Sequence, residues 1–222
     1  MTRKRYYAIV RTISNPKNKV AEFGIAICDR TGDVEDSFGV WVNPHAGNGP
    51  NEAPVEPLDI PLEEHLTWKR LLVEEFTAAE ITEYLKKIVK DYAPTLVAFD
   101  LSTEAQRCAR TGIRLDMFKD RICLKSLAVK HIAGSAAFKR LLRVHSELFS
   151  SLNTELSGRD ADLKLIGWLL LGRPIRLIGT AFYDARWQLA SLLDVVICRR
   201  RPAITNVAEI ASALRRGTPS PV

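Results

Sequence analysis

The stretch VAEFGIAICDRTGDVEDSFGVWVNP, residues 20–44, predicts the first part of the fold. Two runs rich in apolar and β-branched residues flank the segment RTGD, in which Gly32 supplies a hairpin turn. The second run stops at Pro44, because proline cannot donate to a strand ladder. A shorter run of the same kind at Tyr6–Val10 comes before them. We therefore expect three strands in an antiparallel meander.

The rest of the chain is mostly helical in pattern. Apolar residues keep helical spacing from Thr77 to Tyr92, where Pro94 ends the pattern, and the run Thr95–Phe99 predicts a buried strand. We expect a strand end followed by a helix over 121–132, and further helices at about 102–111, 136–152, 160–171 and 183–197. This order predicts an α/β fold in which helices pack on the faces of a mixed sheet.

Length and composition bound the domain organisation. With 222 residues, 46% of them hydrophobic, the chain can bury one substantial core. We expect a single domain over residues 1–198 and a basic extension over 199–222, the end of which is disordered. No apolar run reaches the roughly 18 to 20 residues of a membrane span, and the start lacks a secretory signal. We therefore expect a soluble, cytoplasmic protein with no membrane partner.

The charge distribution favours a polyanionic partner. The net charge is +6, and the segment 107–143 holds ten Lys or Arg against two acids. We therefore expect nucleic acid, DNA or RNA, as the partner, with a protein complex or a homo-oligomer as a further possibility. The candidate contacts are Arg107, Arg110, Lys125, Lys139, Arg140, Arg143, Arg199, Arg200 and Arg201. Solvated helix faces with no partner remain the alternative.

Three short strings along this order of elements resemble the motifs of a known family. They are Glu22-Phe23-Gly24 followed by Asn43-Pro44, LVAFDLSTEAQ at 96–106, and GTAFYDAR at 179–186. The family is the DEDDh 3′-to-5′ exonuclease superfamily, and the resemblance covers about residues 5–197. It implies a ribonuclease H-like fold, in which a three-stranded antiparallel meander is continued by parallel strands and helices pack on both faces.

The chain departs from this family at the residues that carry its chemistry. Such enzymes hold two divalent metals about 4 Å apart with four carboxylates, and a histidine removes the proton from the attacking water. Here no acidic residue precedes Glu22, and the first strand offers Arg11 and Thr12 where the Asp-x-Glu pair would stand. Gly179 stands at the histidine position. The resemblance leaves Asp184 as a retained catalytic carboxylate and Glu104 as a conservative replacement.

Three functions remain open at this point. The first is a catalytically degenerate exonuclease-like protein that needs no cofactor and binds nucleic acid or serves as a subunit of a nucleic-acid-processing complex. The second is an active metal-dependent 3′-to-5′ exonuclease with a displaced site, in which Glu104 and Asp184, joined by Asp100 and Glu22, hold Mg²⁺ or Mn²⁺. The third is a protein-interaction scaffold.

The two candidate carboxylates also have purely structural interpretations. Asp184 can be a solvent-facing or capping residue in the first turn of a helix, where the helix dipole favours it. Glu104 can be an early-helix acid after a cap at Ser102 or Thr103. We expect Trp187, three residues after Asp184, to pack in the core.

Overall fold

The computed structural model describes residues 4–14, 17–42, 75–136, 138–140, 163–173, 175, 180–198 and 200. The chain groups into two compact units, residues 1–124 with 178–191 and residues 125–177 with 192–222. The sequence predicts one domain over 1–198, whereas the second unit begins at residue 125 and extends past residue 198. Of the predicted basic extension, only Arg200 is among the described residues.

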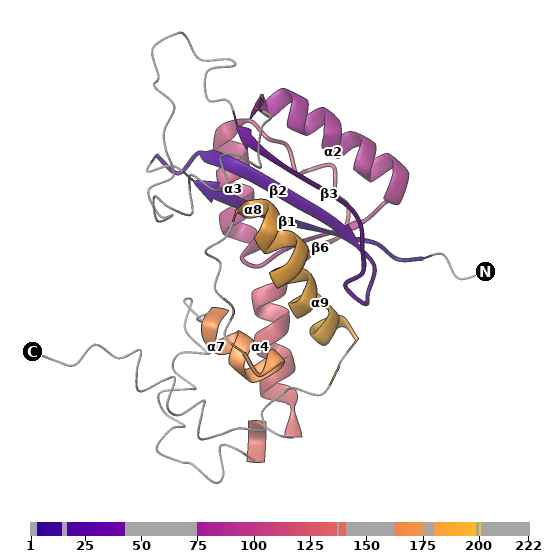
Figure 1. The fold of residues 1–222 in the computed structure, drawn as a ribbon, viewed down its shortest axis with the longest axis vertical. Coiled ribbons are helices and arrows are strands. Elements are labelled where there is room, and N and C mark those ends of the chain that lie inside the picture. The colour runs from indigo at the N-terminus through magenta and orange to yellow at the C-terminus, as the bar shows by residue number, and fades with distance from the viewer. Residues whose placement is uncertain are drawn as a thin grey trace, which may run out of the picture. The chain divides into compact units, whose positions relative to one another are not determined.

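A mixed six-stranded sheet lies in the first unit, counted over the described residues (Figure 1). Its order is β4-β3-β2-β1-β5-β6. The strands are β1 (Tyr7–Ser14), β2 (Val20–Cys28), β3 (Val34–Val42), β4 (Glu75–Phe76), β5 (Thr95–Ala98) and β6 (Arg121–Cys123). Strands β1, β2 and β3 pair antiparallel, whereas β5 joins β1 and β6 joins β5 in parallel. The predicted meander and the mixed α/β sheet are confirmed.

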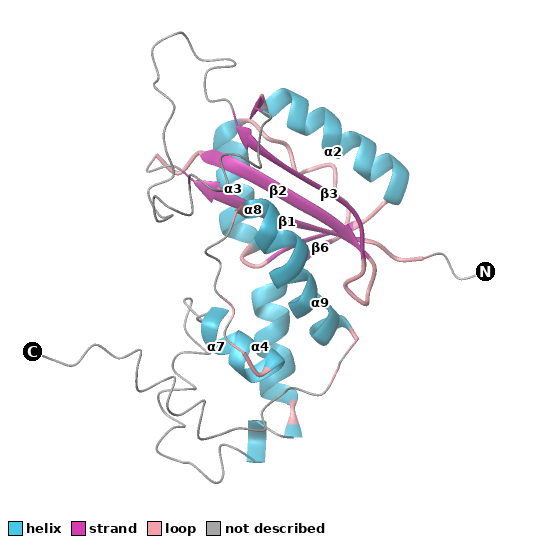
Figure 2. Cartoon of the chain, in the orientation of Figure 1, coloured by secondary structure: helices cyan, strands magenta, loops and turns pink. Residues whose placement is uncertain are grey.

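Helices alternate along the chain with the strands β5 and β6 and then follow them (Figure 2). They are α2 (Ala78–Tyr92), α3 (Leu101–Thr111), α4 (Leu124–Gly134), α7 (Leu163–Leu171), α8 (Ala181–Tyr183), the π-helix η1 (Asp184–Leu189) and α9 (Ala190–Ile197). Most of the helix expected at 136–152 lies outside the described residues. Within the described part of the chain, no helix combines the length and apolar character needed to span a membrane.

Helix α2 begins and ends where its sequence predicts. The Thr77 side chain accepts a hydrogen bond from the Glu80 backbone, and the Glu80 side chain accepts one from the Thr77 backbone, which together form a capping box. Ala93 ends the helix in the left-handed conformation, directly before Pro94. Both ends are therefore fixed by local chemistry.

The two faces of the sheet carry different helices. Alternate residues of β1 point to opposite faces, so Ala8 and Val10 lie on one face and Ile9 and Arg11 on the other. Ala8 and Val10 belong to an apolar cluster that includes residues of α2 and α3, such as Ile81. The opposite face contacts α8 and η1 across β1 and β2 (Figure 1).

Helix α8 approaches the sheet so closely that two strand positions have no room for a side chain. A Cβ atom on Gly24 of β2 would lie 2.3 Å from the Ala181 carbonyl carbon. A Cβ atom on Gly39, the partner of Gly24 in β3, would lie 2.4 Å from Cβ of Phe182. In the string Glu22-Phe23-Gly24, the Phe23 side chain thus lies in the apolar cluster on one face of β2. Glu22 and Gly24 lie on the opposite face, against helix α8.

We expect Gly24→Ala to lower the free energy of unfolding by about 1 to 3 kcal/mol or more, because the added methyl group meets backbone atoms that cannot move aside. Urea unfolding at neutral pH measures this change. Gly134→Ala in α4 is the matched control, since a Cβ there meets nothing within 4 Å. The control is expected to leave stability unchanged or to raise it by up to about 1 kcal/mol. Equal effects of the two substitutions would contradict the close-approach interpretation.

Candidate functional site

The two candidate carboxylates, Glu104 and Asp184, meet at one cation. Arg11 lies near the end of β1, and its guanidinium Nη1 is 2.8 Å from Oε1 of Glu104 in the first turn of α3. Its Nε is 3.8 Å from Oδ2 of Asp184, the first residue of η1. The structure therefore places Glu104 and Asp184 beside the same arginine side chain.

Glu104 is held by the end of β1. Besides Arg11, its carboxylate accepts hydrogen bonds from Thr12, from the backbone N–H at 2.9 Å and from the hydroxyl at 2.5 Å. Only 2% of its side chain is exposed. The helix start is capped instead by Asp100, whose side chain accepts from the Thr103 backbone. The expectation of a cap at Ser102 or Thr103 is therefore wrong, and Asp100 has a capping role.

Asp184 is fully buried, so the prediction of a solvent-facing residue is wrong. The helix start is capped by Thr180, whose hydroxyl accepts from the Tyr183 backbone at 3.1 Å. Asp184 lies one turn further on, beside the Arg11 guanidinium. A buried carboxylate needs a nearby positive charge, and the guanidinium supplies it.

The residues at this position do not fit a two-metal site. A guanidinium between Glu104 and Asp184 supplies N–H donors and a positive charge, and both oppose a metal cation at the same place. Over the ranges that the structure describes, no group of three or more His, Cys, Asp or Glu side chains is arranged to hold a metal. Gly179, which stands where the resemblance would place a histidine, lies outside the described residues.

Glu22 has a structural role that the sequence did not reveal. It is fully buried on β2, and its Oε1 accepts a hydrogen bond from the Ala181 backbone N–H at the start of α8. Burial raises the pKa of this carboxyl from its usual 4.5 to about 8, the charge of Asp184 adds to the rise, and the helix N–H groups oppose it. Glu22 is therefore protonated at neutral pH and caps the helix as a neutral acid.

The signal for this role is the spacing of Glu22 and Gly24. Residues two apart in a strand share a face, so an acid beside a glycine marks a place where a helix start can approach the backbone and be capped. The same placement argues against Glu22 as the additional metal ligand of a displaced site.

The predicted nucleic-acid contacts are divided between the two units. Arg107 and Arg110 lie on α3 in the first unit, and Lys125, Lys139, Arg140 and Arg200 belong to the second unit. The other three candidates, Arg143, Arg199 and Arg201, lie outside the described residues.

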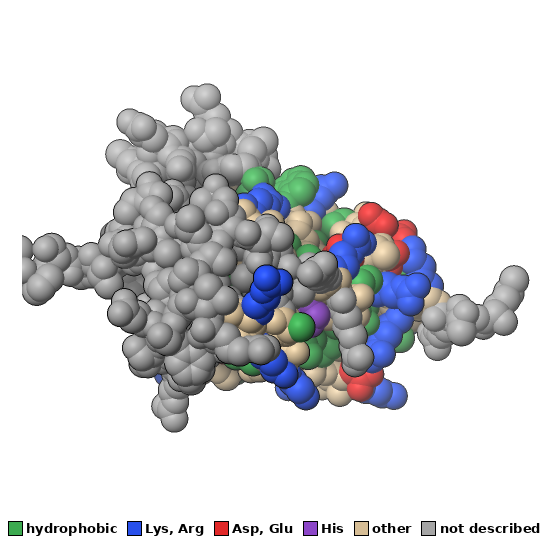
Figure 3. All heavy atoms as spheres, turned by 90° about the horizontal axis from the view of Figure 1, so that it is seen from below, with side chains coloured by type: hydrophobic (Ala, Val, Ile, Leu, Met, Phe, Trp, Pro, Cys, Tyr) green, Lys and Arg blue, Asp and Glu red, His purple; other side chains and the backbone are tan. Residues whose placement is uncertain are grey.

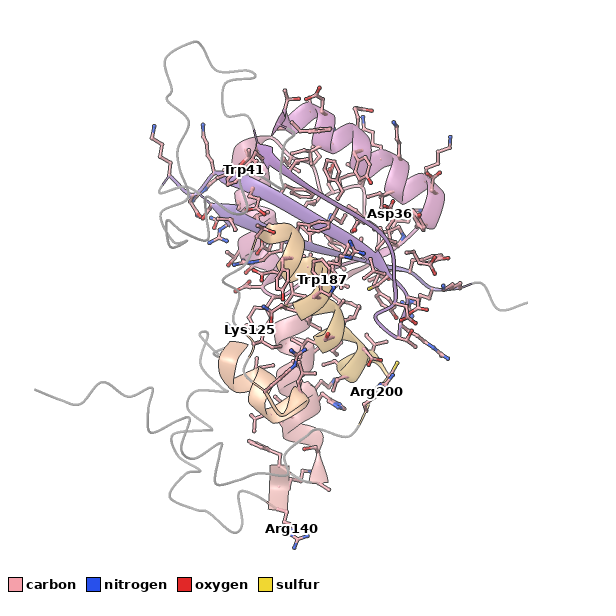
Figure 4. The ribbon with its side chains drawn as sticks, in the orientation of Figure 1. Asp36, Trp41, Lys125, Arg140, Trp187 and Arg200 are labelled. Carbon is pink, nitrogen blue, oxygen red and sulfur yellow. The ribbon has the colours of Figure 1, made fainter. Side chains whose placement is uncertain are left out.

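Some of these cations have partners within their own unit. Arg107 donates to the Asn18 side chain at 3.2 Å, and Nε of Arg200 is 3.0 Å from a carboxylate oxygen of Asp194. Arg110, Lys139 and Arg140 are exposed. In the space-filling view, Lys and Arg side chains are spread over the described surface, and some of them lie beside Asp or Glu (Figure 3). Figure 4 labels Lys125, Arg140 and Arg200.

The prediction that Trp187 packs in the core is wrong, because 46% of this residue is exposed. The expectation assumed an α-helix, in which residues three apart share a face. Here Asp184–Leu189 is a π-helix. Its turn contains more residues than a turn of an α-helix, so each residue is rotated by a smaller angle about the helix axis relative to the one before it. The buried residues of this turn are accordingly Asp184, Ala185 and Leu189, and Trp187 faces away from them.

We expect Arg11→Ala to lower the free energy of unfolding by about 2 to 4 kcal/mol, because it leaves buried carboxylates without their cation. Chemical unfolding measures the loss. In a double-mutant cycle, Arg11→Ala with Glu104→Ala should cost less than the sum of the single changes. Lys86→Ala removes an exposed ion pair with Glu83 and is expected to change stability by no more than about 0.5 kcal/mol. A strictly additive cycle would contradict the coupling.

Glu22 makes stability depend on pH. Its pKa is raised in the folded state, so its contribution is complete below about pH 4.5 and is lost as the pH rises through about 8. We expect a loss on the order of 4 kcal/mol between about pH 5 and about pH 9. Unfolding measured at about pH 5 and about pH 9 tests this, and Glu22→Gln, which keeps an acceptor oxygen and cannot ionise, should flatten the dependence. An equal pH dependence in both proteins would show that Glu22 is not the responsible group.

Comparison with known proteins does not assign the chain to a family. No family model matches the sequence, and no curated protein matches it. The function is therefore argued from the residues of the site and their surroundings.

Proposed function

We propose that the chain is a catalytically degenerate member of the DEDDh exonuclease superfamily, with a ribonuclease H-like fold, that binds nucleic acid without cleaving it. It does so by itself or as a subunit of a nucleic-acid-processing complex. The observation that carries the proposal is the Arg11 guanidinium beside the carboxylates of Glu104 and Asp184.

The loss of catalysis follows from what a guanidinium can do at this position. Metals in phosphodiester cleavage bind the attacking and leaving oxygens directly and lower the pKa of a bound water. Arg11 balances the charges of Glu104 and Asp184 through its N–H groups but has no coordination position for water or for a phosphate oxygen. Arg11 can therefore take the place of a metal in balancing the two negative charges, but it cannot activate a water molecule for attack.

The arrangement of the sheet supports the assignment to this fold. An antiparallel meander of β1, β2 and β3 is continued by the parallel strands β5 and β6. Helices cover both faces, and the residues at the motif positions, Glu104 and Asp184, converge at the end of β1. This is the arrangement expected from the resemblance of the three sequence strings.

Binding to nucleic acid is supported by charge. The net charge is +6, and exposed cations such as Arg110, Lys139 and Arg140 are suited to phosphate oxygens. No divalent metal is needed for contacts of this kind. The shared ligand chemistry is the phosphate backbone, which DNA and RNA both offer.

We expect the purified chain to bind DNA or RNA oligonucleotides with an affinity that falls between about 50 and 200 mM salt, measured by fluorescence anisotropy. Replacing Arg107 and Arg110 by Gln, or separately Lys139 and Arg140, should reduce the log–log salt slope for a single strand by roughly 1.4 if both members of a pair contact phosphate. Lys86→Gln is the control, because it also removes one positive charge, but from a residue of α2 that is paired with Glu83. It should leave the salt slope unchanged. No binding at low salt would remove the proposal and favour the scaffold alternative.

We also expect a 5′-labelled single strand to remain intact with the protein in the presence of Mg²⁺ or Mn²⁺, because Arg11 occupies the position between the carboxylates. Denaturing electrophoresis measures strand length over time. Metal-dependent shortening from the 3′ end that Asp184→Ala abolishes would overturn this expectation and establish the active-exonuclease alternative.

A further inference from the structure

Strand β3 forms an outer edge of the sheet over most of its length. Only the two-residue strand β4 lies beyond it, and β4 pairs with Trp41 and Val42 alone. Every residue of β2 is buried, whereas none of residues 34–39 of β3 is. Among the residues that the structure describes, no strand therefore covers the outer side of β3 over Val34–Val40.

The backbone of β3 indicates that a further strand fits this edge. Alternate N–H and C=O groups of an outer strand point away from the sheet. The Ser37 N–H donates to Oδ1 of Asp36 at 2.7 Å, so the side chain of the preceding residue lies where a strand carbonyl could bind (Figure 4 labels Asp36). The same edge already accepts a strand at its end, because β4 pairs there in parallel.

Aromatic side chains lie beside the edge on one face of the sheet. The Phe38 ring stacks on the Tyr84 ring of α2 at 4.2 Å and an interplanar angle of 23°, and it meets the Phe76 ring of β4 edge-on at 5.2 Å. All three residues are half-buried. Alternate side chains of an added strand would lie on this face, which favours apolar residues at those positions.

The charge at this edge is locally negative. Residues 29–36 hold four acids and one arginine, although the whole chain has a net charge of +6. Glu35 is exposed, lies on the opposite face from Phe38 and pairs with the exposed Lys4. An added strand with cations on the Glu35 face would therefore meet a complementary charge.

We propose that the outer edge of β3 over Val34–Val40 accepts an extended, basic segment of a partner protein as an added strand. The carbonyl groups of that segment would bind the outward N–H groups, and its apolar residues would alternate with Lys or Arg. This inference goes beyond the proposed function and does not depend on binding to nucleic acid.

Charge also favours this partner over a second copy of the chain. Pairing β3 with its own copy would bring two acidic stretches of residues 29–36 to the same edge. Like charges on neighbouring strands destabilise a sheet. A basic segment removes this repulsion and supplies the same backbone hydrogen bonds.

The first test locates the binding of a synthetic seven-residue peptide in which valine and lysine alternate. Amide hydrogen exchange of the full chain is followed by NMR. In the protein alone, the outward amides of Val34–Val40 should exchange rapidly. They should slow by about tenfold at a peptide concentration ten times the Kd, because about one molecule in eleven is then unbound. Outward amides that are protected without peptide, or that no peptide slows, would overturn the proposal.

Changes to the peptide separate strand addition from charge alone. N-methylation of its pairing amides removes the donors and keeps every lysine, and it should weaken binding by roughly 2- to 12-fold for each hydrogen bond lost. Threonine in place of lysine should weaken binding less, and glutamate in place of lysine should weaken it most. Equal affinity of the methylated and unmethylated peptides would exclude an added strand.

A double substitution tests the acidic side chains of the edge. Glu35→Gln with Asp36→Asn removes two charges and keeps an oxygen acceptor for the Ser37 N–H. It should lower affinity for the lysine peptide by about 2- to 10-fold and leave the threonine peptide unchanged. Asp116→Asn with Asp120→Asn is the matched control, because both residues are exposed and precede β6 at the other edge of the sheet. An equal loss in the control would attribute the effect to net charge.

Two further outcomes would identify a different occupant. Protection of the same amides that rises with protein concentration, together with a dimer in sedimentation, would assign the edge to a second copy. Protection by an oligonucleotide and not by the peptide would assign it to nucleic acid. Either result would overturn the partner-segment proposal. Peptide binding without any oligonucleotide binding would leave it standing while the proposed function fails.

Discussion

The close approach of helix α8 to strands β2 and β3 is the constraint on which the site depends. At Gly24 and Gly39 the backbone of the strands serves as the packing surface, and any side chain would hold the helix away. Glu22, beside Gly24 on the same face, accepts the first free N–H of that helix from Ala181. These contacts fix where the helix begins, and therefore where Asp184 lies relative to β1.

Arg11 resolves the electrostatic problem that this packing creates. Two buried carboxylates near one another repel, and bringing them out of water costs several kcal/mol unless a positive charge compensates. A cation that belongs to the chain provides this compensation at Glu104 and Asp184 whatever the surrounding metal concentration. Glu22 avoids the same cost differently, because its raised pKa keeps it neutral. Three acids thus lie in the interior with at most two negative charges and one positive charge among them.

Sequence reasoning succeeded where the signal is local. The apolar runs of β2 and β3, the turn at Gly32 and the helix that starts at Thr77 all follow from the chain within a few residues, and each is present in the structure. It was less complete where tertiary contacts decide. Strand β1 continues past Val10 to Ser14, because its far end is paired with β2 and its Thr12 is bonded to Glu104. The two-residue strand β4 exists only through its pairing with β3.

The sequence by itself determined the α/β class, the order of the meander, and the presence of an arginine and no acid in the first strand, with Glu104 and Asp184 further along the chain. Composition and spacing suffice for these, since they are properties of neighbouring residues. Only the tertiary structure decided that Arg11 reaches both carboxylates, that Glu22 caps a helix as a neutral acid, and that a π-turn directs Trp187 to the surface. Burial and long-range contact set these outcomes, because the cost of a buried charge and the start of a helix depend on groups that are 93 residues away for Arg11 and Glu104 and 159 residues away for Glu22 and Ala181.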